Sequence, residues 1–294
     1  MRGPWYAAAA AATLLLAALT LGVLIVPAGA VVALVTLRHG ARAGVQVGLG
    51  ASALVLLASL GLNQAWQPLL ILAAVVFAPG WVMALILRQQ QAQAGPLLVA
   101  AVLICVYAAG VRLAVDDVAA FWRDLLEPLF ALAARDAGAH FSAEQKTLIA
   151  GQVHGWSLAG MQCMLSGSVL LARWWQAALY NPGGFGAEFR ALKLPRLVLG
   201  VAFVLALLDL IDRSGTFGLA LAGDACAIVV VLFALQGLAV IHHRARITAM
   251  ANAWLVGMYI LIMLMPQITG PLLATTGLID GAVDLRRLGA HQQS

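Results

Sequence analysis

The sequence predicts an all-α fold: a polytopic membrane helix bundle with about eight transmembrane helices, in which residues 1–294 form one integral membrane domain. Two observations predict it. Hydrophobic residues make up 63% of the chain and charged residues only 10%, whereas soluble domains carry roughly 25% charged residues. The mean hydropathy is +0.96. Such a chain does not cover a surface in water, which excludes a cytosolic enzyme, a secreted disulfide scaffold and a disordered protein.

Eight apolar stretches are long enough, or nearly so, to cross a bilayer, which takes about 20 residues. They are 6–37, 43–62, 66–87, 95–115, 148–172, 196–213, 218–241 and 248–265. The first is too long for one straight helix, and Pro27 and Gly29 interrupt it, so we expect either a kinked helix or a hairpin of two short ones. Pro266, Pro271 and a half-length apolar piece follow the last stretch. The chain therefore crosses the membrane eight to ten times.

Basic residues concentrate in connections that fall on one side of the membrane if successive spans alternate. Positively charged loops stay in the cytoplasm, so we expect a multi-pass protein of the bacterial inner membrane with these loops inside. The net charge of +5 does not indicate nucleic-acid binding, because the cations are spread over short loops between apolar runs. The loop residues are Arg38, Arg42, Arg88, Arg173, Arg190, Lys193, Arg196, Arg244 and Arg246.

Segment 116–146 is the sizeable piece outside the apolar stretches, and acidic residues outnumber basic ones in it. Apolar residues recur in it at helical spacing from Val118 through Trp122 to Leu129, so we expect an amphipathic helix on the outer membrane interface. A lid over an outward-facing cavity is the alternative. Ser142 and Gln145 have the spacing of a capping box, which predicts that a new helix begins there and continues into the fifth span.

Ionisable side chains inside apolar spans are costly and indicate function by default. Asp224 has no basic residue within reach along its own helix, so it is either protonated or paired with another helix. Arg112 and His154 approach the same side of the membrane and are the candidate partners. Arg112 also stands one turn before Asp116, and Asp209 one turn before Arg213, which favours two local ion pairs.

The fifth span carries a repeat of small residues every four positions, which lets membrane helices approach closely. Gln162 and Ser166 fall in the same sector. They either form an interhelical hydrogen bond or line a substrate pocket. In the second interpretation, the substrate-binding residues are Arg112, His154, Gln162 and Asp224. The repeat consists of Gly151, Gly155, Ala159, Cys163 and Gly167.

No catalytic or metal-binding motif stands out, so we expect neither an enzyme nor a cofactor or metal. The chain has no Walker A loop and would not hydrolyse ATP by itself. The doublet His242-His243 lacks acidic or cysteine neighbours, and the three cysteines lie in apolar runs with no metal spacing.

The predicted cytoplasmic loop 173–195 combines aromatic anchors with a sharp turn. Trp174, Trp175 and Tyr180 are typical of the membrane interface, and residues 181–184 read Asn-Pro-Gly-Gly, a strong turn signal. Residues 185–194 can form a short helix. The loop is either simply well anchored or a docking site for a cytoplasmic partner, formed by Tyr180, Asn181, Gly183, Gly184 and Phe185.

Several strings of the chain resemble a known family. They are Leu-Tyr-Asn-Pro-Gly-Gly-Phe at 179–185, and the segments 34–40, 236–242, 277–280 and 284–286. Together they are similar to the proteobacterial branch of the domain-of-unknown-function 2232 membrane proteins, also called YybS-like, over nearly the whole chain. The tail departs at Leu285, where the family has an aromatic residue. The family is distantly similar in fold to the S components of energy-coupling-factor transporters and to MreD. The resemblance implies a location and an architecture, and no catalytic residue.

These observations favour two functions. The first is an S-component-like transport subunit that binds a small molecule near the outer leaflet and docks on an ATPase and transmembrane coupling module. The second is an MreD-like membrane scaffold for cell-envelope or cell-shape machinery. A pocket bordered by polar side chains would favour transport, and a bundle core filled with Leu, Val and Ala would favour the scaffold.

Overall fold

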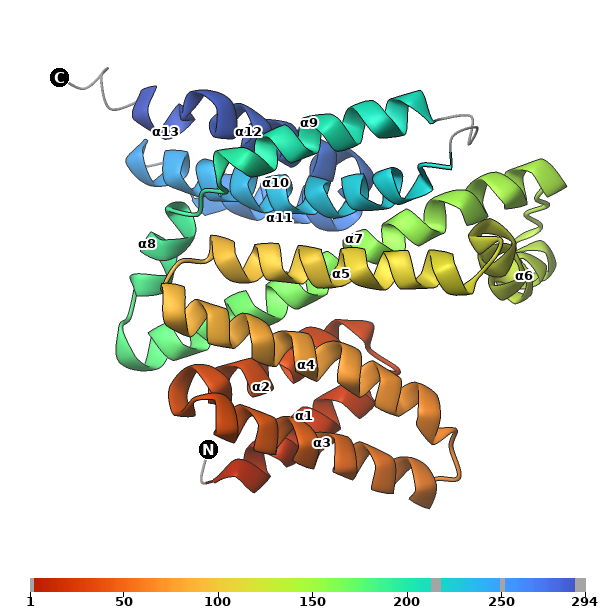
Figure 1. Cartoon of the computed structure of the whole chain (residues 1–294), viewed down its shortest axis with the longest axis horizontal. Coiled ribbons are helices and arrows are strands. Elements are labelled where there is room, and N and C mark those ends of the chain that lie inside the picture. Colours follow the sequence, from red (N-terminus) through yellow and green to blue (C-terminus); the bar gives the residue numbers. More distant parts are fainter. Residues whose placement is uncertain (1–2, 213–217, 249–251, 289–294) are drawn as a thin grey trace.

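The computed structural model describes residues 3–212, 218–248 and 252–288, and within these ranges all regular structure is helical. The all-α prediction is confirmed. Most of the longer helices lie side by side along one direction (Figure 1). The helices are α1 Pro4–Ala17, η1 Gly22–Leu24, α2 Ile25–His39, α3 Ala41–Gly61, α4 Trp66–Gln90, α5 Ala94–Ala114, α6 Val118–Ala137, α7 Ala143–Tyr180, α8 Gly184–Arg190, α9 Arg196–Ile211, α10 Ala220–Ile247, α11 Asn252–Leu264, α12 Pro266–Val283 and α13 Leu285–Leu288.

Five helical segments are long and apolar enough to cross a membrane. They are Gly22–His39, Ala41–Gly61, Trp66–Gln90, Ala94–Ala114 and Ala220–Ile247. The predicted spans at 148–172 and 196–213 correspond to α7 and α9, which are outside this group, and α9 has only 16 residues. A crossing number of eight therefore stays a prediction.

The N-terminal apolar stretch folds as a hairpin of α1 and α2, the second of the two predicted forms. The chain reverses at residues 18–24, before Pro27 and Gly29 rather than at them. Pro27 lies in the first turn of α2, where its missing N–H loses no helical hydrogen bond. Gly29 is required by packing, because a Cβ there would lie 2.8 Å from the Ser168 Oγ of α7.

The interior consists of two apolar clusters that meet along α2. One joins α2, α4, α5, α7 and α10 and includes Met83, Leu158 and Phe233. The other joins α1 to α4 and includes Val32 and Val55. Both are built mainly from Ala, Val and Leu, and α2 is buried continuously from residue 28 to residue 37. The bundle is therefore held by close packing of small and branched side chains.

The closest helix crossing joins α10 to α12 at Gly237 and Gly277. A Cβ on Gly237 would lie 1.9 Å from the Leu273 carbonyl oxygen, and one on Gly277 would lie 2.0 Å from the Phe233 carbonyl oxygen. Only glycine on both helices allows this backbone contact.

The small-residue repeat of the fifth span makes ordinary packing contacts at part of its length rather than a backbone-to-backbone approach. A Cβ on Gly155 would lie 3.7 Å from the Ala227 Cβ, and one on Gly167 would lie 3.4 Å from the Val26 Cγ1. A Cβ on Gly151 would meet no atom within 4 Å, and Cys163 is exposed. The buried face of α7 is an adjacent stripe that has the same period of four. It consists of Ala150, His154, Leu158, Gln162 and Ser166.

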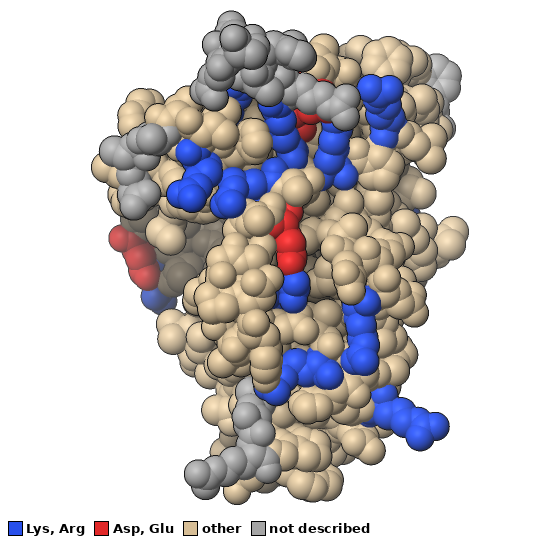
Figure 2. Space-filling model, turned by 90° about the vertical axis from the view of Figure 1, so that its left-hand side faces the viewer, with Lys and Arg blue, Asp and Glu red and all other residues tan. Residues whose placement is uncertain are grey.

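The basic loops gather at one end of the bundle. The end of α2, the starts of α3 and α9, and the ends of α4, α7 and α10 all lie at the left in Figure 1. Figure 2 views this end and shows Lys and Arg side chains spread across it. The opposite end carries α6, which joins the end of α5 to the start of α7.

Candidate functional site

The centre of the candidate site is an ion pair between α5 and α10. The Arg112 guanidinium binds the Asp224 carboxylate through two nitrogens, and the Nη2–Oδ1 distance is 2.8 Å. The Asp224 side chain is 5% exposed and that of Arg112 is 28% exposed. Asp224 therefore finds its partner on another helix. The local pair with Asp116 is not formed, and Arg213 of the other predicted pair lies outside the described residues.

His154 of α7 completes the site. Its side chain is 4% exposed, and its Nε2 lies 3.5 Å from the Asp224 Oδ2. Its Nδ1 accepts a hydrogen bond of 3.2 Å from the indole Nε1 of Trp122. Because a neutral imidazole that accepts at Nδ1 carries its proton at Nε2, the N–H faces Asp224. The distance is too long for a good hydrogen bond, so this buried donor has no partner.

Trp122 belongs to α6, which packs on α7 and contacts the site through His154. Figure 1 shows α6 nearly end-on, across the ends of α5 and α7. Asp117 caps its first turn by accepting from the Ala120 N–H at 2.9 Å. Val118 and Phe130 are its buried residues. Whether α6 lies on the outer membrane interface or acts as a lid over a cavity stays a prediction.

Side-chain contacts to α7 and to the following connection fix the far end of α6. Lys146 donates to both Glu127 oxygens, at 2.8 and 3.1 Å. The Phe130 ring packs against that of Phe141, with their centroids 5.2 Å apart. The start of α7 is set by the predicted capping box, in which Gln145 N donates to Ser142 Oγ and Ser142 N donates to Gln145 Oε1. The far end of α6 is thus tethered, whereas Trp122, nearer its start, contacts His154.

Gln162 does not join this cluster. It lies eight residues beyond His154, about 12 Å further along α7. Its amide nitrogen donates to the Leu97 carbonyl of α5 at 3.1 Å and to Ser166 Oγ at 3.2 Å. The side chain is fully buried. Gln162 thus makes the interhelical hydrogen bond that was one of its two predicted roles, whereas Arg112, His154 and Asp224 come together.

A second buried polar cluster, which sequence reasoning missed, lies near the basic end. Gln236 of α10 accepts from Leu194 N at 2.9 Å, and donates to Gly277 O at 3.2 Å and to Asp280 Oδ2 at 2.8 Å. Arg286 pairs with Asp280 at 3.0 Å. The network ties the end of loop 173–195, α10 and the C-terminal segment together. The available signal was an amide and a carboxylate, Gln236 and Asp280, in otherwise apolar runs.

The predicted docking turn is well defined. α7 ends at Tyr180, and Gly183 has φ +86°, a left-handed conformation that glycine adopts without strain. A Cβ on Gly184 would lie 2.3 Å from the Asn181 Nδ2, so a side chain there would require the Asn181 amide to move. Phe185, in the first turn of α8, stacks on Phe189, and their ring centroids are 6.0 Å apart.

Ionic and aromatic contacts hold this turn against the bundle. Arg173 of α7 forms a two-point ion pair with Glu188 of α8, in which the Nε–Oε2 distance is 2.8 Å. The Arg38 guanidinium lies over the Tyr180 ring, 4.7 Å from its centroid. These contacts hold the loop against the end of α7, and its role as a docking site stays a prediction.

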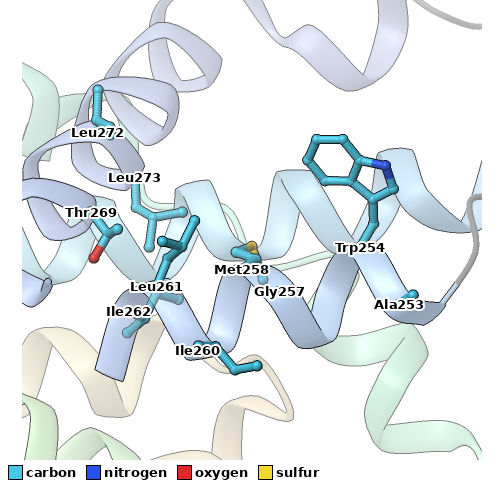
Figure 3. A pocket seen from close by; sticks show the side chains of 10 residues that line it. All are labelled: Ala253, Trp254, Gly257, Met258, Ile260, Leu261, Ile262, Thr269, Leu272 and Leu273. Atoms are coloured by element: carbon cyan, nitrogen blue, oxygen red, sulfur yellow. The ribbon is translucent and has the colours of Figure 1, made fainter. Parts of the chain in front are cut away.

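Two cavities lie away from the polar site. Figure 3 shows a hollow of about 640 Å³ between α11 and α12, with an apolar lining that includes Trp254 and Leu273. A second, of about 520 Å³, lies between α1, α2 and α7. Neither includes Arg112, His154 or Asp224 in its lining. Within the described residues no group of three or more His, Cys, Asp or Glu could hold a metal ion.

Comparison with protein families gives one match. Residues 185–281 match the family described as Predicted membrane protein (DUF2232). The predicted resemblance to this family is confirmed over this segment, which runs from α8 into α12 and includes Asp224 and Gln236. No curated protein and no solved structure matches the chain. The similarity to S components and to MreD stays a prediction.

Proposed function

We propose that this predicted membrane protein is a non-enzymatic, multi-pass subunit of the bacterial inner membrane that binds a small polar molecule beneath α6. In this proposal the arginine-bearing end faces the cytoplasm and the Arg112–His154–Asp224 site faces outward. The protein would work as an S-component-like transport subunit. Coupling to ATP hydrolysis would be supplied by a separate module.

The observation that carries the proposal is the buried His154 Nε2 donor beside a buried ion pair. Burying charged groups costs several kcal/mol per ion unless they gain good partners, and in a membrane they are retained chiefly for function. Arg112 still has its Nη1 donor, and His154 has its Nε2 donor. A ligand oxygen, anionic or hydroxyl, placed between them would satisfy both. The site therefore suits a small molecule with a carboxylate or several hydroxyl groups.

α6 supplies the means of access. In this structure Trp122 contacts His154, and Val118 and Phe130 are the buried residues of α6. Lifting α6 would break the Trp122–His154 hydrogen bond and expose the same His154 ring that the ligand would contact. Ligand entry and lid movement are thereby linked through one residue.

The turn formed by Tyr180, Asn181, Gly183, Gly184 and Phe185 is the proposed docking site for the coupling module. It lies at the opposite end of the bundle from α6, and α7 connects the two, because one end of this 38-residue helix follows α6 and the other precedes the turn. In this proposal α7 would transmit the structural change caused by ligand binding to the coupling module.

Native purification followed by mass spectrometry tests this function. The wild-type protein should retain a small molecule that the Asp224→Asn variant loses. Asp224→Asn keeps the size of the side chain and removes the charge that holds Arg112. Asp124→Asn is the matched control, because Asp124 is an exposed carboxylate on α6. The proposal fails if wild type carries no small molecule after purification, or if Asp224→Asn retains it as wild type does.

The scaffold function is the second candidate, and one observation favours it. Both apolar clusters are filled by Ala, Val and Leu, and the two described cavities are not at the polar site. A scaffold would need the docking turn but not His154. Copurified proteins separate the two functions: an ATPase and its membrane partner would support the transport subunit, and cell-envelope assembly proteins would support the scaffold.

A further inference from the structure

The groove between α1, α2 and α7 combines an apolar wall with a basic mouth. Its volume is about 520 Å³, within the range of small-molecule pockets. Val31, Leu34 and Arg38 line it from α2, at spacings of three and four residues that place them on one stripe of the helix. Leu14 of α1 and Leu179 of α7 line the other walls. The groove is thus apolar along its length and cationic where α2 ends.

The charges that the first four helices bring to the mouth are all positive. The chain has no acidic residue before Asp116, so α1 to α4 contribute only cations. Arg88 reaches across to α2 and donates to the carbonyls of Thr36 and Leu37, each at 3.4 Å. Among the described residues no carboxylate forms an ion pair with Arg38 or Arg88. The lower part of the face in Figure 2 shows basic side chains without acidic ones between them.

The dimensions match those of a lipid at the membrane surface. Val31 lies about 10 Å deeper than Arg38, because an α-helix rises 1.5 Å per residue. Tyr180 lies under the Arg38 guanidinium, and Trp175 also lines the groove. Both aromatic types prefer the boundary between headgroups and acyl chains. An acyl chain along the apolar wall would therefore bring its headgroup to the level of Arg38.

We propose that this groove binds an anionic phospholipid of the leaflet at the arginine-bearing end, with the headgroup phosphate on Arg38 and one acyl chain against Val31 and Leu34. His39, which also lines the groove, lies at the same end and adds a second donor to the headgroup site. Basic pockets between transmembrane helices bind such headgroups by this combination of charge and burial. The bound lipid would join α1 and α2 to α7, and so would stabilise the N-terminal hairpin on the bundle.

Native mass spectrometry of the full-length protein tests the proposal. Delipidated protein is titrated with dioleoyl phosphatidylglycerol and, separately, with dioleoyl phosphatidylcholine. The anionic lipid should bind more tightly, and Arg38→Gln should weaken its binding about fivefold, the effect of one basic residue near an anionic headgroup. Arg246→Gln is the control, since Arg246 is an exposed basic residue at the end of α10. It should leave the affinity unchanged.

The apolar wall is tested separately. Ala178→Phe adds a ring at an exposed position that lines the groove and should lower the occupancy of phosphatidylglycerol. Ala9→Phe adds the same ring at an exposed position of α1 that is not part of the lining and should not.

Three results would overturn the proposal. In the first, phosphatidylcholine binds as well as phosphatidylglycerol. In the second, Arg38→Gln and Arg246→Gln weaken binding equally, which would indicate a diffuse basic surface. In the third, glycerol phosphate displaces the lipid at equal concentration, so that the acyl chain contributes nothing.

Discussion

Arg112 and Asp224 are separated by 112 residues in the sequence, and they form a two-point ion pair that joins α5 to α10. The pair lies beside the His154 ring. It should contribute to the stability of the bundle, and in the proposed function it also forms part of the ligand site.

Breaking this pair from one side should cost more than removing both charges. Arg112→Met leaves the buried Asp224 carboxylate without its partner, and loss of one member of a buried pair costs about 3–5 kcal/mol. The double variant Arg112→Met/Asp224→Leu should recover a large part of that loss. The measurement is the midpoint of thermal unfolding in detergent. If the loss of stability in the double variant equals the sum of the losses in Arg112→Met and Asp224→Leu, the two charges do not act as a pair.

The crossing of α10 and α12 should not tolerate a methyl group. Gly277→Ala places a Cβ 2.0 Å from the Phe233 carbonyl oxygen, and relief requires the two backbones to separate. We expect a loss of about 1–3 kcal/mol or more in the free energy of unfolding. Gly270→Ala, on the same helix with no atom within 4 Å of the added Cβ, should be neutral or slightly stabilising. Equal stability of the two variants would argue against the close contact.

The closed position of α6 should depend on one indole hydrogen bond. Trp122→Phe keeps an aromatic ring but removes the donor to His154 Nδ1, and such a bond contributes about 1 kcal/mol. Hydrogen exchange of the α6 amides should become roughly fivefold faster. Trp156→Phe is the control, because the Trp156 side chain is exposed on α7. Unchanged exchange in Trp122→Phe would mean that other contacts hold α6 down.

Two fully buried glutamines should differ in importance. Gln236→Met leaves the Leu194 N–H and the Asp280 carboxylate without their amide partners, and each orphaned buried group costs about 1–3 kcal/mol. Gln162→Met should cost less. The amide that it removes has an Oε1 without a partner, and the Leu97 carbonyl that loses a donor lies within α5, where the helix supplies another donor. We expect Gln236→Met alone to increase proteolysis within residues 181–195. Similar proteolysis of both variants would contradict the role of the network.

The sequence predicted contacts correctly where the local chemistry left few possible partners. Asp224 had no partner on its own helix, so a residue of another helix had to approach it, and Arg112 does. Ser142 and Gln145 formed the expected cap because both groups belong to one turn. Segment 116–146 contains a helix in the expected place, although its position at a membrane surface is not tested by the fold.

Packing contacts between distant helices could not be predicted from the sequence in this way. The glycine crossing depends on two residues 40 positions apart, Gly237 and Gly277, and no pattern in either helix alone identifies the other. The Gln236 network uses Leu194 N, a backbone group that sequence patterns do not reveal. The repeat of the fifth span did not identify the buried face of α7, because the adjacent stripe of His154, Leu158 and Gln162 has the same period of four.

The orientation of the bundle is the claim on which the outward-facing site and the cytoplasmic docking turn both depend. It is measured most directly by labelling His140→Cys and Asn181→Cys separately, each in a chain whose three native cysteines are replaced by alanine, with a membrane-impermeant maleimide on intact spheroplasts. The account predicts that His140→Cys is labelled from outside and that Asn181→Cys is labelled only after the membrane is opened. Labelling of Asn181→Cys in intact spheroplasts would contradict it.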